Sequence, residues 1–198
     1  MKRIALYGGG FDPVHFGHLN LAIDLMEMHQ LQKVYFCPAF CSPHKLDKPP
    51  MASSQNRWEM LKLAIDDIPE MVSWDFEIQN ETPSYTVKSL EELQKIEKDA
   101  EIFLILSEDA LFTFKKWKNP EEILKIAQLL VGTRRDSSEN LLLDFPEEWK
   151  KRIHISKTRI LEISSTEIRK RLQEKKYCAH LIPYKTTQYI YQKNLYGA

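Results

Sequence analysis

Glycine is scarce in this sequence, and most of it is gathered in one place. Only six of the 198 residues are glycine. Four of them, Gly8, Gly9, Gly10 and Gly17, fall within one stretch of ten residues. Glycine is used where a backbone turns tightly or where a ligand approaches it closely. The distribution therefore indicates one such place near the N-terminus.

An excess of charge of either sign is also missing. Lys and Arg together number 28, and Asp and Glu together number 28, so the formal net charge is zero. Proteins that bind duplex nucleic acids usually carry a clear basic excess, because neutralising phosphates drives their affinity. We therefore expect no nucleic-acid partner, and an anionic ligand must be bound by a local cluster of donors.

Long apolar runs are absent as well. None reaches about 18 residues, the length that crosses a bilayer, and the N-terminus has no signal-peptide core, so we expect no membrane partner. The three cysteines are an odd number, which favours a reducing, cytoplasmic location. Cys37, Cys41 and His44 offer two thiols and an imidazole to a zinc ion. No fourth ligand stands nearby in the sequence, so metal binding by this set stays open.

The length and the ordinary composition predict a single domain over residues 1–198. Short apolar runs alternate with amphipathic stretches, which is typical of an α/β fold: a Rossmann-like open parallel sheet with helices on both faces. Strands are expected at 3–7, 33–38, 72–78, 101–106 and 129–133, and the stretches 153–156 and 159–163 are expected to supply one or two more. Helices are expected at 19–31, 53–68 (with Trp58, Leu61 and Ile65 on its apolar face), 85–98, from Asn119 onward, 164–174 and 186–194.

The glycine cluster belongs to a longer motif, residues 8–18, which follows the first expected strand and precedes the first helix. Ligands of open α/β sheets bind beyond the carboxyl ends of the strands. Backbone N–H groups of a glycine turn and the start of a helix together favour phosphate. His15 and His18 add ring N–H groups that bind phosphate oxygens. The Gly-Lys-Ser/Thr sequence of a Walker loop is missing, so a Walker-type NTPase is not supported.

A second cluster of anion-binding groups lies near the C-terminus. Ser164 and Glu167 form a capping box at the start of a helix. Ser165 and Thr166 add hydroxyls at the same helix start, where the free N–H groups favour phosphate. Arg169 lies about one turn further along and carries a planar fork of donors. The alternative reading is a well-capped surface helix with a basic face.

Both clusters resemble signatures of one enzyme superfamily. GGGFDPVHFGH at 8–18 is similar to the GxFxPxHxGH motif of the nucleotidyltransferases, and ISSTEIR at 163–169 is similar to their ISSTxxR motif. Between them, Pro43-His44-Lys45, Ser84-Tyr85-Thr86 and Asp109 followed by Trp117 resemble the bacterial-type nicotinate-nucleotide adenylyltransferase family. The phosphopantetheine adenylyltransferases share both end motifs, but they are shorter and lack the central series.

The resemblance implies adenylyl transfer from ATP to nicotinate mononucleotide, giving deamido-NAD and pyrophosphate in NAD biosynthesis. Such transfer is an in-line attack on the α-phosphorus of ATP, catalysed by positioning and charge stabilisation. Mg²⁺ is expected to arrive with ATP, because no Asp/Glu cluster resembles a dedicated metal site. Three alternatives stay open: transfer to phosphopantetheine, transfer to nicotinamide mononucleotide, and a nucleotide-binding regulator without turnover. A monomer and a homo-oligomer are equally compatible with the sequence.

The resemblance also implies a role for each matching residue, with a C-terminal helical part from about 164 packing on the sheet and completing the ATP site. The catalytic set is His15, His18 and Arg169. The ATP and phosphate set is Gly8, Gly9, Gly10, Phe11, Lys45, Asp109, Ser164, Ser165 and Thr166. The set for the nicotinate nucleotide is Tyr85, Thr86, Trp117 and Arg134, with Trp117 stacking on the pyridine ring.

Three positions depart from the family pattern. Gly10 stands where Thr or Ser is usual, which removes one hydroxyl near phosphate. Ser107 stands where Gly is usual, two residues before Asp109. Lys118 follows Trp117 where an aromatic residue is common, so the pyridine pocket is expected to differ in detail.

Overall fold

The computed structural model describes residues 1–43, 49–133, 141–159 and 161–198. Contacts divide the chain into two compact units. Unit 1 comprises Met1–Tyr7, Leu21–Val34 and Tyr85–Ile160, and unit 2 comprises Gly8–Asn20, Tyr35–Ser84 and Leu161–Ala198. The prediction of a single domain stays a prediction. In the described part of the chain, no helix has the length and apolarity needed to cross a membrane.

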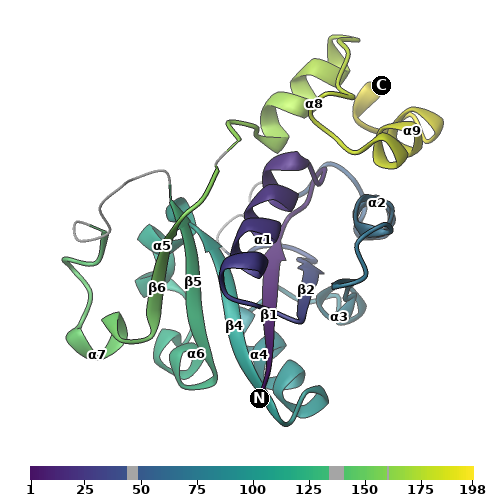
Figure 1. Cartoon of the computed structure of the whole chain (residues 1–198). Helices are drawn as coiled ribbons and strands as arrows, with labels where there is room; N and C mark the ends of the chain where they lie inside the picture. Colours follow the sequence, from purple (N-terminus) through teal and green to yellow (C-terminus); the bar gives the residue numbers. More distant parts are fainter. Residues whose placement is uncertain (44–48, 134–140, 160) are drawn as a thin grey trace. The chain divides into compact units, whose positions relative to one another are not determined.

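The strands form one open six-stranded sheet in the order β3-β2-β1-β4-β5-β6 (Figure 1). The pairings β1–β4, β4–β5 and β5–β6 are parallel. The predicted Rossmann-like parallel sheet is thereby confirmed. The strand bounds are β1 Lys2–Gly9, β2 Lys33–Pro38, β3 Met71–Ser73, β4 Ala100–Ser107, β5 Ala127–Thr133 and β6 Ile153–Lys157.

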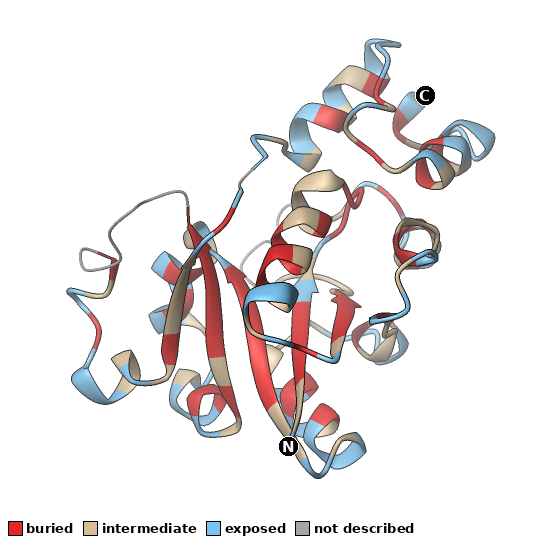
Figure 2. Cartoon of the chain, viewed as in Figure 1, coloured by how far each residue is buried: buried red, intermediate tan, exposed pale blue. Residues whose placement is uncertain are grey.

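The centre of the sheet in unit 1 is buried on both faces. Side chains of β4 from Ile102 to Leu106 are all buried, as are those of β5 from Leu129 to Thr133 (Figure 2). Such unbroken apolar runs are typical of parallel strands covered by helices on both sides. The prediction for 101–106 is therefore confirmed, and the register places Leu104 beside Leu129.

Helices cover both faces of these strands. Figure 1 shows α1 (Phe16–Met28) on one face and α6 (Pro120–Ile126) on the other. Close packing on the α1 face depends on Gly132 of β5, where a Cβ atom would lie 2.8 Å from Thr158 Oγ1 and would collide with Leu21 of α1. The other helices of unit 1 are α4 Thr86–Ile96, α5 Glu108–Thr113, the 3₁₀ turn η1 Phe114–Lys116 and α7 Glu147–Lys150.

Unit 2 contains a helical group formed by distant parts of the chain. Its helices are α2 Ser54–Ile65, α3 Phe76–Gln79, α8 Ser165–Gln173, α9 Tyr184–Gln192 and the 3₁₀ turn η3 Leu195–Gly197. Ser53 caps α2 by accepting the Asn56 N–H. The helix α9 packs on α2, and its Thr186 hydroxyl donates to the Met60 carbonyl oxygen at 3.1 Å.

One predicted strand is too long, and the two stretches expected to supply one or two strands supply one. The strand expected at 72–78 is only β3, and the chain then turns into α3, where the rings of Trp74 and Phe76 stack with centroids 5.1 Å apart. Of the stretches 153–156 and 159–163, only the first forms a strand, β6, in the described part of the chain. The reason is Arg159, whose backbone N–H donates to Asp24 Oδ2 at 2.8 Å instead of to a neighbouring strand. The helices α5 and α7 are too short to show helical periodicity and were not expected.

Candidate active site

The glycine-rich motif makes its tight turn at Phe11 rather than at a glycine. Gly8 and Gly9 are the last residues of β1, and Phe11 adopts a left-handed backbone with φ 45°. The Phe11 ring folds back over Gly9, where a Cβ atom would lie 2.9 Å from it. Space beside the Cα atoms of Gly8 and Gly10 is open. Gly9 therefore allows the Phe11 ring to pack against the backbone, while the backbone at Gly8 and Gly10 is accessible to a ligand.

Phe11 supports the second histidine of the motif. The Phe11 ring is 2% exposed. Its centroid lies 5.1 Å from that of His18 in an edge-to-face arrangement, and 5.7 Å from that of Phe36. Aromatic pairs prefer such tilted contacts. The turn at Phe11 thus fixes the His18 ring from one side.

His15 and His18 are held against each other at the start of α1. Their ring centroids lie 3.7 Å apart, and the His15 backbone N–H donates to His18 Nδ1 at 3.3 Å. The close approach of His15 requires Gly17, because a Cβ atom there would lie 3.0 Å from the His15 ring. Gly9, Phe11 and Gly17 therefore have packing roles in placing two imidazoles side by side.

Burial keeps both imidazoles neutral at neutral pH. It lowers the pKa of His15 to about 4. Burial, together with the neighbouring His15, lowers the pKa of His18 well below its ordinary value. Among the residues that the structure describes, nothing hydrogen-bonds to the buried His15 Nδ1. Neutral imidazoles act toward an anion as N–H donors, not as cations.

Asp12 is a buried carboxylate with several donors around it. Its Oδ2 accepts the Met51 N–H at 2.8 Å, and its Oδ1 accepts the Ala52 N–H at 3.1 Å. The Tyr196 hydroxyl donates to Oδ1 at 2.7 Å. Buried carboxylates need such partners, since an unpaired one is costly. Asp12 thereby ties the motif to the chain at 51–52 and to the C-terminal turn η3.

The predicted second motif contacts the first within unit 2. Ser164 caps α8 by accepting the Glu167 N–H at 3.1 Å. The Ser165 hydroxyl donates to the Pro13 carbonyl oxygen at 2.9 Å. Arg169 Nη1 donates to the Asp12 carbonyl oxygen at 2.6 Å, and Nη2 donates to Thr166 Oγ1 at 3.1 Å. The start of α8, Arg169 and the histidine motif thus form one cluster of donors.

A buried arginine, Arg57, also belongs to this cluster, and it was not predicted from the sequence. Arg57 on α2 has no exposed surface. Its Nη1 donates to the Gly10 carbonyl oxygen at 2.8 Å, and its Nη2 to that of Phe40 at 3.0 Å. Burial lowers the pKa of Arg57, and the charge of Asp12 opposes this shift. No sequence signal separates Arg57 from the surface cations of an amphipathic helix.

Three of the residues expected to bind the nicotinate nucleotide, Tyr85, Thr86 and Trp117, lie in unit 1. Tyr85 and Thr86 stand at the start of α4, and both are half-buried. Trp117 is half-buried, with its Nε1 donating to Thr113 Oγ1 at 3.3 Å. Lys118 Nζ lies 4.3 Å from the Tyr85 ring centroid. Tyr85 and the segment at 117–118 are therefore neighbours.

The remaining predicted residues are only partly described by the structure. Asp109 is exposed in the first turn of α5. Lys45, Arg134 and His44 lie outside the described residues. Cys37 is buried, which raises the pKa of its thiol. Within the described ranges no group of three or more His, Cys, Asp or Glu side chains is placed to hold a metal ion.

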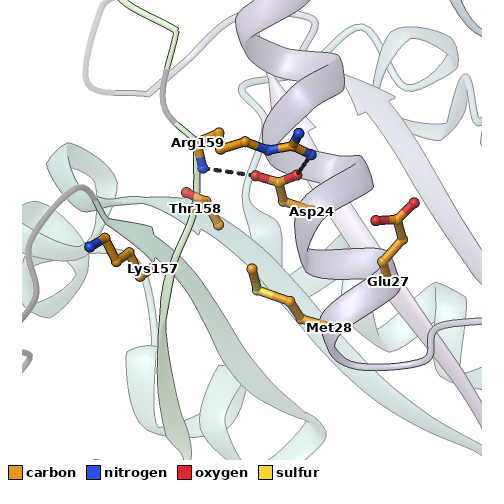
Figure 3. A pocket seen from close by; sticks show the side chains of 6 residues that line it. All are labelled: Asp24, Glu27, Met28, Lys157, Thr158 and Arg159. Atoms are coloured by element: carbon orange, nitrogen blue, oxygen red, sulfur yellow. Dashed lines mark hydrogen bonds and ion pairs between the residues drawn. The ribbon is translucent and has the colours of Figure 1, made fainter.

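A pocket of about 390 Å³ in unit 1 involves none of the predicted residues (Figure 3). Asp24, Glu27 and Met28 of α1 line one side, and Lys157, Thr158 and Arg159 line the other. The Arg159 guanidinium pairs with Asp24 Oδ1 at 2.8 Å. This ion pair satisfies the nearly buried Asp24 carboxylate.

Comparisons with known proteins agree with the motifs. The sequence model of the Cytidylyltransferase-like family matches residues 6–171. A protein of Methylacidiphilum infernorum (isolate V4) named probable nicotinate-nucleotide adenylyltransferase is 35% identical over 194 residues, covering 98% of this chain and 92% of that protein. A protein of the same name from Hydrogenobaculum sp. (strain Y04AAS1) is 38% identical over 194 residues, covering 98% of each.

A solved structure supports the same fold. The nicotinic acid mononucleotide adenylyltransferase of Plasmodium falciparum, complexed with NaAD, matches with a TM-score of 0.78 and 20% identity. The match covers 100% of this chain and 98% of that one. At this identity the likeness concerns the fold, whereas the relatives above 30% identity over nearly the full length establish kinship. The chain belongs to the nicotinate-nucleotide adenylyltransferase family.

Proposed function

We propose that this protein transfers the adenylyl group of ATP to nicotinate mononucleotide, giving deamido-NAD and pyrophosphate in NAD biosynthesis. The observation that carries the proposal is the joining of the two motifs in unit 2. Ser165 donates to the Pro13 carbonyl oxygen, and Arg169 donates to that of Asp12. The start of α8, a guanidinium and two imidazoles are thereby assembled around one turn, as binding of a polyphosphate requires. The names of the relatives supply the second substrate.

The proposed chemistry needs no covalent intermediate on the protein. A phosphate oxygen of nicotinate mononucleotide attacks the α-phosphorus of ATP, the bond to the α–β bridging oxygen breaks, and pyrophosphate leaves. Catalysis then consists of alignment and of stabilising charge on the phosphoryl oxygens. Donors that are fixed before the reaction are effective because they do not reorganise during it. His18, which is held by Phe11 and His15, is such a donor.

The proposal assigns the phosphates of ATP to unit 2. His15, His18 and Arg169 are the catalytic set. Gly8 and Gly10 offer open backbone, and Ser164 and Thr166 are exposed at the start of α8. Gly9 and Phe11 shape the turn, and Ser165 fastens α8 to it. Lys45 is proposed as a further phosphate ligand, and Asp109 of unit 1 as a ribose ligand.

A divalent cation is part of the ATP substrate in this reaction, and we propose Mg²⁺. Mg²⁺ is commonly held by substrate phosphates and waters with few protein ligands. The described residues suit this mode, because they hold no cluster of carboxylates that would make a resident site. The imidazoles and hydroxyls around the turn would contact phosphate oxygens and leave the cation to its waters.

Recognition of the nicotinate nucleotide is proposed for residues of unit 1. The half-exposed Trp117 ring suits stacking on a flat pyridine ring. The backbone N–H groups at the start of α4, at Tyr85 and Thr86, suit a carboxylate. Arg134 belongs to the same proposed set. We place the reaction in the cytoplasm, in keeping with the odd number of cysteines.

The test is pyrophosphate release from ATP and Mg²⁺ with each of three acceptors: nicotinate mononucleotide, nicotinamide mononucleotide and phosphopantetheine. We expect release with nicotinate mononucleotide, matched mole for mole by deamido-NAD on chromatography. Preference for the amide or for phosphopantetheine would overturn the substrate assignment. No turnover with any acceptor, together with measurable ATP binding, would favour a nucleotide-binding regulator instead.

A further inference from the structure

The C-terminal turn η3 places a tyrosine hydroxyl on the glycine-rich motif. Tyr196 is 8% exposed, and its hydroxyl donates to Asp12 Oδ1 at 2.7 Å. Its backbone is left-handed, with φ 59°, as is that of Asn194, with φ 49°. Such conformations in residues other than glycine are strained, and they persist where the surroundings hold them in place. The burial of the ring and the bond to Asp12 are what hold Tyr196.

The Asp12 carboxylate receives its hydrogen bonds from neutral groups. Besides the Tyr196 hydroxyl, the donors are the backbone N–H groups of Met51 and Ala52. Arg57, the second cation of the cluster, directs its Nη groups to the Gly10 and Phe40 carbonyl oxygens. The Asp12 carboxylate is therefore stabilised by neutral donors, and neither Arg57 nor Arg169 is bound face to face with it.

Arg169 stands beside this carboxylate without engaging it fully. Its Nη1 lies 3.7 Å from Asp12 Oδ2, beyond a direct hydrogen bond, and donates to the Asp12 carbonyl oxygen at 2.6 Å. A carboxylate and a guanidinium with no other partners form a short bidentate pair. In such a pair the carboxylate offsets the positive charge of the arginine and occupies two of its N–H donors. The arginine would then attract a phosphate less strongly.

We propose that Tyr196 is a positioning residue for ATP: by donating to Asp12 it keeps that carboxylate from capturing Arg169, and so leaves the guanidinium available to the triphosphate. This inference rests on the proposed function, which assigns Arg169 to ATP. It extends the nucleotide site to the C-terminal turn, which neither motif includes. Tyr196 itself touches no substrate in this account.

The experiment compares two tyrosine-to-phenylalanine variants of the full chain. Tyr196→Phe removes the donor to Asp12. Tyr189→Phe is the matched control, because it removes a hydroxyl of α9 that donates to Asn56 Oδ1 at 2.9 Å in the same unit. Each variant is assayed for kcat and for the KM of ATP and of nicotinate mononucleotide. Its affinity for ATP with Mg²⁺ is measured by calorimetry, and its folding by circular dichroism.

We expect Tyr196→Phe to raise both the KM and the Kd for ATP by roughly five- to tenfold, because Arg169 must then leave the Asp12 carboxylate before it can bind a phosphate. The KM for nicotinate mononucleotide should stay within about twofold. A merely structural loss would lower the active fraction and leave the KM for ATP unchanged. In an Arg169→Lys background, Tyr196→Phe should add less than it does alone, because the two residues act together.

An unchanged affinity for ATP in Tyr196→Phe, or an equal loss in Tyr189→Phe, would overturn the inference. Failure of the proposed function has a different signature, since the unaltered protein would then release no pyrophosphate with nicotinate mononucleotide. In that case the calorimetry of ATP in the same variants still decides the role of Tyr196.

Discussion

The imidazoles of His15 and His18 lie against each other, with their centroids 3.7 Å apart and their planes tilted by 31°. A proton on either ring would place a charge in a buried site and against the other ring. The folded state therefore favours the neutral form of both rings. Protonating either ring lowers the stability of the folded protein.

Acidification from pH 7 to pH 5 should therefore destabilise the protein. The ordinary pKa of 6.5 falls to about 4 for folded His15. The unfolded chain then binds more protons between these values, so the contribution of His15 is complete above about 6.5 and is lost as the pH falls toward 4. We expect a loss of about 2 kcal/mol from His15 between pH 7 and pH 5. Urea unfolding at pH 7 and at pH 5 measures this loss in the free energy of unfolding. In His15→Asn the free energy of unfolding should fall clearly less between the two pH values.

His18→Ala should abolish most turnover and leave the fold intact. Loss of one fixed donor to a charged transition state costs about a hundredfold in kcat or more. Steady-state pyrophosphate release measures this, with circular dichroism as the check on folding. The control is His180→Ala, because His180 is exposed and its ring stacks only on Tyr177 among the described rings. Near-normal kcat in His18→Ala would contradict the assignment of His18 to the phosphates.

Gly9→Ala should destabilise the protein, whereas Gly8→Ala should not. A Cβ atom on Gly9 would meet three ring atoms of Phe11 at 2.9 to 3.2 Å, so the buried ring must move. Overpacking of this kind costs about 1–3 kcal/mol. Gly8 has open space and an ordinary φ, so its substitution should stay within about 0.5 kcal/mol. Denaturant midpoints compare the two, and equal midpoints would show that the turn adapts.

Arg57→Met should cost about 3 kcal/mol in the free energy of unfolding. The methionine side chain leaves the carbonyl oxygens of Gly10 and Phe40 without their donors. Lys62→Met on the same helix is the control: Lys62 lies over the Trp58 ring and pairs with Glu59 at the surface. Lys62→Met should lower the free energy of unfolding by no more than about 1 kcal/mol. Urea unfolding distinguishes them, and a small effect at Arg57 would mean that water replaces the guanidinium.

Trp117→Leu should weaken binding of the nicotinate nucleotide more than binding of ATP. Loss of a stacking ring is expected to raise the KM for nicotinate mononucleotide by about tenfold. Trp149→Leu is the matched control, because both indoles pack on the same Phe114 ring, at 5.6 and 5.9 Å between centroids. Equal changes in the two variants would indicate loss of packing around Phe114 instead of a lost substrate contact.

Local signals predicted much of the fold. The strand β2 has the expected bounds at 33–38, and the cap of α8 is the expected Ser164. These features depend on neighbouring residues, so their pattern is visible in the sequence. The strand expected at 72–78 ends after Ser73, and the helix α3 that follows at Phe76–Gln79 was not visible in the local pattern.

The apolar face expected for α2 illustrates the same limit. Spacing placed Trp58 there with Leu61 and Ile65, but the buried residues include Arg57 and Met60, while Trp58 is half-buried. A cation becomes an interior residue only if acceptors reach it. Here the acceptors are carbonyl oxygens of Gly10 and Phe40, far away along the chain. The same holds for the bond between Tyr196 and Asp12, which join opposite ends of the sequence.

The hydrogen bond from the His15 backbone N–H to His18 Nδ1 also decides which tautomer His18 adopts. A neutral imidazole carries its proton on one nitrogen, so a ring that accepts at Nδ1 holds its proton at Nε2. In many sites a carboxylate bonded to the imidazole fixes the tautomer, and that carboxylate itself titrates. Here a backbone N–H group fixes the tautomer, and a peptide group does not titrate. His18 therefore presents the same donor atom throughout the pH range in which its ring is neutral.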